Sequence, residues 1–211
     1  VRINAHGSPW FADDVAALRE AGIDAVMLPK TEGAAQVEAL TASFGRSMPV
    51  VALIETAAGL ADLAAALRVG NVIGAAFGSL DYALDLGSDT HWQTLLFARS
   101  EIVLRSRLAG LPAPIDGVCP TTDDTGPVTA DATAAAGLGF GGKLAIHPRQ
   151  VAAIAAAFMP GEADIAWARK VVAVAGDGNP VKVAGQMVDR PVLERARRIL
   201  ARAGGGQPSM P

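Results

Sequence analysis

The sequence predicts an α/β fold, namely a (β/α)8 TIM barrel that lacks its first one or two βα units and carries a C-terminal helical extension. Three observations support this prediction. Short β-branched runs alternate with helical stretches of about ten residues, as in βαβ units on a parallel sheet. The strand runs are apolar throughout, as expected for strands that are buried on both faces. No glycine-rich dinucleotide fingerprint follows any of these strands, and the sequence contains no P-loop.

Six runs have the length and composition of strands: Val1–Asn4, Ala25–Leu28, Val50–Ile54, Val72–Phe77, Ile115–Val118 and Lys143–Ile146. A closed parallel barrel needs eight strands. Because the chain opens within a strand, we expect the first two βα units to precede Val1. A complete, open doubly wound sheet also accommodates six strands and is the competing interpretation.

Helical periodicity occurs between and after these strands, at Phe11–Ala21, Ala34–Phe44, Leu60–Leu67, Trp92–Ala109, Ala130–Ala136, Arg149–Phe158, Glu162–Ala175 and Arg190–Ala203. Several of these segments carry start or stop signals, such as Ser8-Pro9 before the first helix and Gly22 and Gly110 after helices.

We expect residues 1–175 to form the partial barrel. Residues 176–203 are expected to form an extension whose helix docks on a neighbouring subunit, and residues 204–211 a flexible tail.

Composition and charge exclude several classes of protein. A chain of 211 residues that is 51% hydrophobic and 18% charged is typical of a compact globule. A net charge of −3 provides no basic surface for nucleic acid or an anionic membrane. The single cysteine, Cys119, cannot form a disulfide framework, which favours a cytoplasmic location. No run approaches the roughly 18 uncharged apolar residues expected of a membrane-spanning helix.

Two carboxylates follow successive strands of the predicted sheet. Glu55 ends the run Val-Ala-Leu-Ile-Glu, and Asp81 comes one βα unit later in Phe-Gly-Ser-Leu-Asp. Catalytic groups of parallel barrels gather at the carboxyl ends of the strands, so we expect these two side chains to be neighbours. Two carboxylates, with the other positions left to water or substrate, are a common way to hold Mg²⁺. A helix cap or a salt bridge is the alternative interpretation for each carboxylate.

Other polar residues at the strand ends give weaker signals. Lys30 could bind a phosphate or carboxylate of a ligand, or it could be an ordinary surface lysine. We interpret His147 as a structural residue that is hydrogen-bonded to the main chain, and Cys119 as a small buried thiol. Arg99 is expected on a solvated or salt-bridged helix face.

Seven motifs occur in order along the chain: VRIN, MLPKTE, ALIET, AFGSLDYALDLG, LFARSEIVLRSRLAGLPAPIDGV, GFGGKLAIHPRQV and GQMVDRPVLERARRIL. Together they resemble the citrate lyase β-subunit/malyl-CoA lyase family of the HpcH/HpaI aldolase superfamily, from Val1 to about Ala203. The sequence departs from the pattern at Leu80, because Gly-Ser-Leu-Asp stands where citrate-lyase-like members have Gly-Ala-Glu-Asp.

The resemblance implies a (β/α)8 barrel and a set of site residues. Glu55 and Asp81 correspond to the Mg²⁺ ligands of the family, and Arg2 to the arginine that holds the oxygens of the α-keto acid. Asp189 resembles an aspartate that reaches the neighbouring subunit's site as a general acid/base. The implied partners are an acyl thioester, an α-keto acid and further copies of this chain in a homo-oligomer, a trimer or a hexamer.

We therefore expect a Mg²⁺-dependent carbon–carbon lyase. Its substrate would be a 3-hydroxy-3-carboxyacyl thioester of the citryl-, malyl- or citramalyl-CoA type, cleaved into an α-keto acid and an acyl thioester. Arg2 would stabilise charge on the keto-acid side, and Asp189 would exchange a proton with the thioester enolate carbon. Two alternatives stay open, namely an acyl-CoA thioesterase on the same scaffold and a non-catalytic barrel fragment or binding module.

Overall fold

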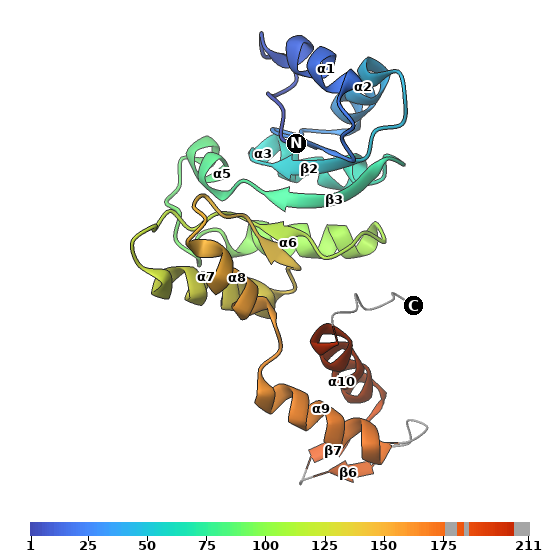
Figure 1. Ribbon diagram of the computed structural model, residues 1–211, viewed down its shortest axis with the longest axis vertical. Coiled ribbons are helices and arrows are strands. Elements are labelled where there is room, and N and C mark those ends of the chain that lie inside the picture. The colour runs from blue at the N-terminus through green and yellow to red at the C-terminus, as the bar shows by residue number, and fades with distance from the viewer. Residues whose placement is uncertain (176–180, 184–185, 205–211) are drawn as a thin grey trace. The chain divides into compact units, whose positions relative to one another are not determined.

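The computed structural model describes residues 1–175, 181–183 and 186–204 (Figure 1). The chain forms two compact units, a first unit of Val1–Ala155 and a second unit of Ala156–Pro211. The boundary between the two units lies earlier in the chain than residue 175, where the sequence placed the end of the partial barrel. Apart from Gly204, the predicted tail lies outside the described residues.

Ten helices occur in the described residues, at α1 (Phe11–Glu20), α2 (Ala34–Phe44), α3 (Ala57–Ala61), α4 (Leu63–Ala66), α5 (Ser79–Leu86), α6 (Leu96–Leu108), α7 (Thr125–Leu138), α8 (Gln150–Phe158), α9 (Glu162–Ala175) and α10 (Arg190–Ala203). Seven strands occur in the same part of the chain, at β1 (Val26–Leu28), β2 (Val50–Ile54), β3 (Val72–Phe77), β4 (Ile115–Asp116), β5 (Gly142–Lys143), β6 (Val181–Val183) and β7 (Gln186–Val188).

Strands β1 to β5 form one sheet in which every neighbouring pair is parallel and the spatial order follows the chain order. A doubly wound sheet reverses its strand order at a switch point, and this sheet has no such reversal within the described residues. The observed order is that of consecutive strands in a (β/α)8 barrel. The prediction of an α/β fold with a parallel sheet is therefore confirmed.

The predicted first strand, Val1–Asn4, is not a regular strand. It joins the sheet through a single parallel bridge between Arg2 and Met27. The Met27 amide donates to the Val1 carbonyl at 2.8 Å, and the Ile3 amide donates to the Met27 carbonyl at 3.3 Å. This segment still lies beside β1, so Arg2 is placed next to the strand that leads to Lys30.

Helices α2, α9 and α10 have the predicted bounds, whereas two other helical predictions were wrong in extent. The expected single helix Leu60–Leu67 is divided into α3 and α4 around Asp62. The expected helix Ala130–Ala136 is longer and begins at Thr125, because the Asp124 carboxylate caps it by accepting from the Gly126 amide at 2.8 Å.

Three further differences concern the region after β3 and the second unit. Helix α6 begins at Leu96 rather than at Trp92, and it packs alongside β3 (Figure 1). Helix α5 follows β3 directly, where the sequence suggested only a strand end. Strand β6 lies in the connection Gly176–Gln186, for which no structure was predicted, and it pairs antiparallel with β7, which begins at Gln186.

Each unit has its own apolar core. In the first unit the strands supply fully buried side chains, among them Leu28, Ile54 and Phe77. In the second unit a separate cluster joins α9 and α10, with Ala168, Val171, Val188, Leu193 and Ala196 buried at its centre. The apolar face of α10 therefore packs against α9 of the same chain.

The stretch Gln150–Val174 has the length and composition of a helix that could cross a membrane. The sequence prediction had found no such stretch. In the structure this stretch is not one continuous helix, because α8 ends at Phe158 and α9 begins at Glu162. Pro160 and Gly161 interrupt it, and a broken helix leaves main-chain groups that a bilayer could not satisfy. This stretch therefore does not support a membrane-spanning function.

Candidate functional site

The carboxyl ends of β1, β2 and β3 lie side by side and carry most of the predicted site residues. Ile54 and Phe77 are partners in the β2–β3 ladder, so Glu55 and Gly78 follow directly from paired positions. The Gly78 amide donates to the Ile54 carbonyl at 2.8 Å and extends the ladder past the strand end. Lys30 follows β1, which is the neighbour of β2 on its other side.

Glu55 is a buried carboxylate, only 4% exposed. Its Oε2 accepts a hydrogen bond from the main-chain amide of Lys30 at 2.9 Å. Burial raises the pKa of Glu55 above the ordinary value for a glutamate, and the negative charge of Asp81 raises it further. The Lys30 amide and the positive charges of Arg2 and Lys30 lower this pKa, but burial is the largest effect. A carboxylate that is costly to ionise at this position is favourable for binding a cation.

The same electrostatic interactions show which charged groups surround Glu55. Asp81, Arg2 and Lys30 all lie near enough for their charges to act on the Glu55 carboxylate. Asp81 is exposed in the first turn of α5, and Arg2 is exposed on the segment beside β1. The structure thus gathers four of the five predicted site residues at one edge of the sheet.

Gly78 leaves room for the Glu55 carboxyl group. A side chain at position 78 would place its Cβ 2.6 Å from Glu55 Oε1 and 2.9 Å from Glu55 Cδ, closer than atoms can approach. Any residue other than glycine would therefore displace this carboxylate. The Glu55 carboxylate can occupy its position after β2 only because position 78, after β3, is a glycine.

The site offers oxygen ligands of the kind that Mg²⁺ prefers. The described residues contain no cluster of three or more His, Cys, Asp or Glu side chains able to hold a metal. Glu55 and Asp81 would therefore supply two ligands, and water or substrate oxygens would fill the other positions, which is usual for Mg²⁺. The buried carboxyl group of Glu55, with the Asp81 charge near it, fits this role.

Asp189, the fifth predicted site residue, belongs to the second unit. It is the N-cap of α10, and its side chain accepts a hydrogen bond from the Val192 amide at 3.2 Å. The carboxylate is exposed, and Pro191 occupies the first turn of the helix. This cap is a structural role for Asp189 besides the proton transfer that the resemblance implies, and it fixes the carboxylate at the helix end.

A buried charge network in the first unit was not predicted. Arg99 on α6 donates to Asp116 at the end of β4 through a 2.9 Å ion pair, and the other Asp116 oxygen pairs with Lys143 of β5 at 2.7 Å. Lys143 also contacts Asp131 of α7 at 3.1 Å. Arg99 is 3% exposed and stacks on Trp92, 4.1 Å from the ring centre. Of the two predicted environments for Arg99, a solvated or a salt-bridged helix face, the structure shows the salt bridge, and it is buried rather than solvated.

Three further polar groups have structural roles. His147 Nδ1 accepts from the Arg149 amide at 3.1 Å, which confirms the interpretation of His147 as a main-chain-bonded residue. Cys119 is a buried free thiol, as expected. Gln150, which the sequence analysis did not single out, is 1% exposed and donates to the carbonyls of Cys119 and Thr121 at 2.9 and 2.8 Å. Gln150 thereby ties the loop after β4 to the start of α8.

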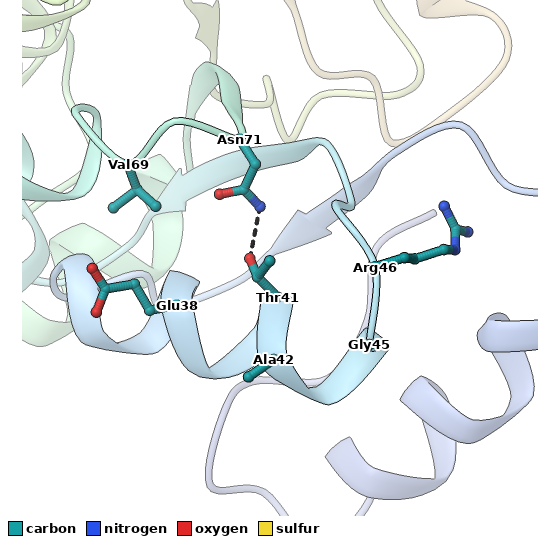
Figure 2. A pocket seen from close by; sticks show the side chains of 7 residues that line it. All are labelled: Glu38, Thr41, Ala42, Gly45, Arg46, Val69 and Asn71. Carbon is teal, nitrogen blue, oxygen red and sulfur yellow. Dashed lines mark hydrogen bonds between the residues drawn. The ribbon is translucent and has the colours of Figure 1, made fainter.

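A hollow of about 480 Å³ lies at the opposite ends of the strands, between the end of α2 and the segment that precedes β3 (Figure 2). Its lining residues are Glu38, Thr41, Ala42, Gly45, Arg46, Val69 and Asn71. The Asn71 amide lies at one side of the hollow and donates to Thr41 Oγ1 at 2.7 Å (Figure 2). It also donates to the Met48 carbonyl at 2.7 Å. Active sites of parallel barrels lie at the carboxyl ends of the strands, so this hollow is separate from the carboxylate site.

Comparison with known proteins points in the same direction as the geometry. The family model described as HpcH/HpaI aldolase/citrate lyase matches residues 1–148. The chain is 38% identical, over 95% of its length and 74% of the relative's, to a citrate lyase subunit β-like protein of Deinococcus radiodurans. It is 30% identical to the mitochondrial citramalyl-CoA lyase of Rattus norvegicus, with 96% of this chain and 68% of that protein covered.

A solved structure is similar over almost the whole chain. The protein CitE of Mycobacterium tuberculosis, in complex with magnesium, acetoacetate and coenzyme A, superposes with a TM-score of 0.88 at 34% identity. The superposition covers 97% of this chain and 77% of that chain.

Proposed function

The chain belongs to the HpcH/HpaI aldolase/citrate lyase family, and from this premise we propose that it is a Mg²⁺-dependent carbon–carbon lyase acting on a coenzyme A thioester. The observation that carries the proposal is the gathering of Glu55, Asp81 and Arg2 at one edge of the parallel sheet. The relative from Rattus norvegicus is named a citramalyl-CoA lyase, and the Mycobacterium tuberculosis structure holds magnesium and coenzyme A, which supports the same chemistry here.

The substrate that we propose is a 3-hydroxy-3-carboxyacyl thioester of the citryl-, malyl- or citramalyl-CoA type. Its products are an α-keto acid and a shorter acyl thioester. We place the sheet β1–β5 in a (β/α)8 barrel, because its strand order has no reversal. We also propose a homo-oligomer, a trimer or a hexamer, in a cytoplasmic location.

Glu55 and Asp81 are the residues that would hold the metal. Bound there, Mg²⁺ supplies a Lewis acid that stabilises negative charge on the hydroxyl and carboxylate oxygens of the substrate. Burial of Glu55 raises the free energy of its ionised form. A bound cation would lower this free energy by pairing with the buried charge. Asp81 is exposed at the start of α5 and leaves one side of the site open to solvent.

Arg2 and Lys30 would bind the negatively charged parts of the substrate. The substrate hydroxyl would first give its proton to solvent water, and its oxygen would then become the new carbonyl as the bond to the thioester α-carbon breaks. The planar guanidinium of Arg2 can donate two hydrogen bonds to the keto-acid oxygens. The ammonium of Lys30 is exposed and would meet a phosphate or carboxylate of the thioester.

Asp189 would act on the other product. The electron pair of the broken bond is left on the thioester α-carbon as an enolate, and a protonated Asp189 would donate the proton that completes the acyl thioester. The N-cap bond from Val192 uses Asp189 Oδ1 and fixes the direction of the side chain. We propose that Asp189 performs this step in the site of a neighbouring subunit.

Product analysis tests the proposed reaction. The protein is incubated with Mg²⁺ and each candidate thioester, and the products are identified by mass spectrometry. A lyase releases one α-keto acid and one shorter acyl thioester per turnover. Release of free coenzyme A with the intact hydroxy acid would instead identify a thioesterase, and no turnover of any candidate would contradict the proposal.

Mixing two inactive variants tests the shared site. Asp189→Asn protein and Glu55→Ala protein are combined under conditions that allow subunits to exchange. If the site is shared, mixed oligomers contain some sites in which both residues are intact, and activity returns. Absence of recovery after demonstrated exchange would mean that Asp189 does not act across subunits.

A further inference from the structure

Lys30 has an unusual main-chain conformation next to the proposed metal site. Its φ angle is +48°, and it is the one residue other than glycine with a positive φ in the described part of the chain. The left-handed region is unfavourable for residues with a Cβ, so such a conformation persists only where the surroundings hold it. Outliers of this kind concentrate at functional sites.

The surroundings of Lys30 hold this conformation through the next residue, Thr31, which is completely buried. The Thr31 hydroxyl donates to the Leu28 carbonyl at 2.8 Å, and the Thr31 amide donates to the Leu53 carbonyl at 3.1 Å. These bonds fix the turn to both β1 and β2. Helix α3 also backs against it, because a Cβ on Gly59 would lie 2.5 Å from the Thr31 carbonyl oxygen.

The fixed turn directs one main-chain group at Glu55. The Lys30 amide donates to Glu55 Oε2 at 2.9 Å, while Glu55 Oε1 lies on the side of Gly78. The carboxylate is therefore held between a main-chain donor from the β1 turn and the space that Gly78 leaves. The exposed Lys30 ammonium acts on Glu55 only through its charge, whereas the main-chain amide makes the hydrogen bond.

We propose that Lys30 is a positioning residue for Glu55, and that it acts through its left-handed main chain and amide N–H rather than through its ammonium group. The inference deepens the proposed Mg²⁺ site and rests on it. A fixed amide loses little entropy when it holds a carboxylate, whereas a flexible lysine side chain would lose rotamer freedom. The role requires a residue that tolerates a positive φ at position 30 and keeps its N–H.

Three substitutions at position 30 separate the main chain from the charge, and all of them keep the N–H. Lys30→Met removes the charge and is unbranched at Cβ, as lysine is. Lys30→Gly removes the charge and relieves the left-handed strain. Lys30→Val also removes the charge, but a β-branched residue strongly resists a positive φ. Met and Val form the matched pair, because both are uncharged and apolar.

The first measurement is Mg²⁺ affinity by calorimetric titration of the full chain. We expect Lys30→Met and Lys30→Gly to bind within about twofold of the original protein, and Lys30→Val to bind at least about tenfold more weakly, because a hydrogen bond to a charged group is lost. Equal losses in Met and Val would show that the ammonium is responsible and would overturn the proposal. Unchanged affinity in Val would overturn it as well.

The second measurement does not depend on metal. Hydrogen exchange of the amide of residue 30 is followed by NMR in the metal-free protein. We expect protection in the original chain and loss of that protection in Glu55→Ala. Fast exchange in the original chain, or protection that survives in Glu55→Ala, would overturn the proposal even if Lys30→Val did not fold. If Glu55→Ala leaves Mg²⁺ affinity unchanged, the proposed metal site fails, and the exchange result still decides whether Lys30 holds Glu55.

Discussion

Residues Val1–Ala155 and Ala156–Pro211 have opposite charge and are built differently. The first unit contains 16 Asp and Glu against 10 Lys and Arg, and the second contains 5 against 8, so the first is acidic and the second basic. The first unit is organised around a parallel sheet, whereas the described part of the second contains the end of α8, the helices α9 and α10, and the antiparallel pair β6–β7.

The two units also place their acidic groups by different means. Parallel strands deliver Glu55 to a common edge, where burial and main-chain contacts hold it. The second unit holds Asp189 as a helix cap at the surface. In the proposed mechanism, the first unit binds Mg²⁺ through Glu55 and Asp81, and the second unit supplies Asp189 for proton transfer. The predictions below test whether the two units can be perturbed separately.

The largest effect is expected in the first unit at Asp116, which holds the buried charges of Arg99 and Lys143. Asp116→Ala should lower the free energy of unfolding by about 3–5 kcal/mol, because it leaves buried cations without this partner. Glu194→Ala, in the half-exposed pair with Arg197 of the second unit, should cost less than about 1 kcal/mol. Denaturant titration measures both, and equal losses would show that burial does not distinguish the two pairs.

In the second unit, Leu193→Ala should cost about 2–4 kcal/mol of unfolding free energy, because Leu193 is 3% exposed in the α9–α10 cluster. Activity should fall, since Asp189 caps the helix that Leu193 anchors. Mg²⁺ affinity should stay unchanged. Met187→Ala, at an exposed position of the same unit, is the control and should have little effect. A parallel loss of Mg²⁺ affinity in Leu193→Ala would contradict the separation of roles.

A smaller effect is expected at Arg2. Arg2→Lys keeps the charge but removes the two-pronged geometry, so activity should fall at least about tenfold, or roughly 1.4 kcal/mol of transition-state binding. Arg46→Lys, an exposed arginine beside the hollow at the opposite strand ends, is the matched control and should retain activity. Steady-state kinetics at saturating Mg²⁺ decide the matter, and a fully active Arg2→Lys enzyme would assign Arg2 a structural role.

The smallest effect concerns pH. Burial raises the pKa of Glu55 in the folded protein, so the folded state binds more protons than the unfolded state between the ordinary glutamate pKa and the raised one. In this interval the stability of the metal-free protein should fall as pH rises, and Glu55→Gln should remove that fall. Hydrogen bonds from Thr94 and His91 lower the pKa of Asp89, so its effect on stability lies below the ordinary aspartate pKa, and Asp89→Asn is a control that should leave the slope in the Glu55 interval unchanged. Denaturation curves measured across this interval would contradict the account if Glu55→Gln left the slope unchanged.

Much of the fold could be predicted because its strands are pure apolar runs. Val50–Ile54 and Val72–Phe77 were predicted with their observed bounds, since β-branched runs between polar turns leave little ambiguity. Helix α5 was missed because Gly78 and the short motif after it resemble a strand end followed by a loop. The predicted strand Val1–Asn4 is observed only as a single bridge between Arg2 and Met27. A strand becomes regular only where a neighbouring strand pairs with it along its length, and the sequence pattern does not specify that neighbour.

The candidate site divides in the same way. That Glu55 and Asp81 lie near each other followed from the rule that parallel strand ends meet, so sequence spacing was sufficient. The pairing of Arg99 with Asp116 could not be predicted, because it joins a helix to a strand and depends on side-chain direction. The left-handed Lys30 was also beyond prediction, since lysine gives no sequence signal for a positive φ.

The most direct test of the account is a calorimetric titration with Mg²⁺. The protein should bind one ion per chain, and both Glu55→Ala and Asp81→Ala should weaken binding by at least about tenfold, because each removes an oxygen ligand. Asp85→Ala is the matched control, since Asp85 lies on the same helix as Asp81 but accepts from the Ala57 amide at 2.8 Å. It should bind Mg²⁺ as the original protein does. Undiminished affinity in Glu55→Ala or Asp81→Ala, or a loss in Asp85→Ala as large as in Asp81→Ala, would contradict the metal site.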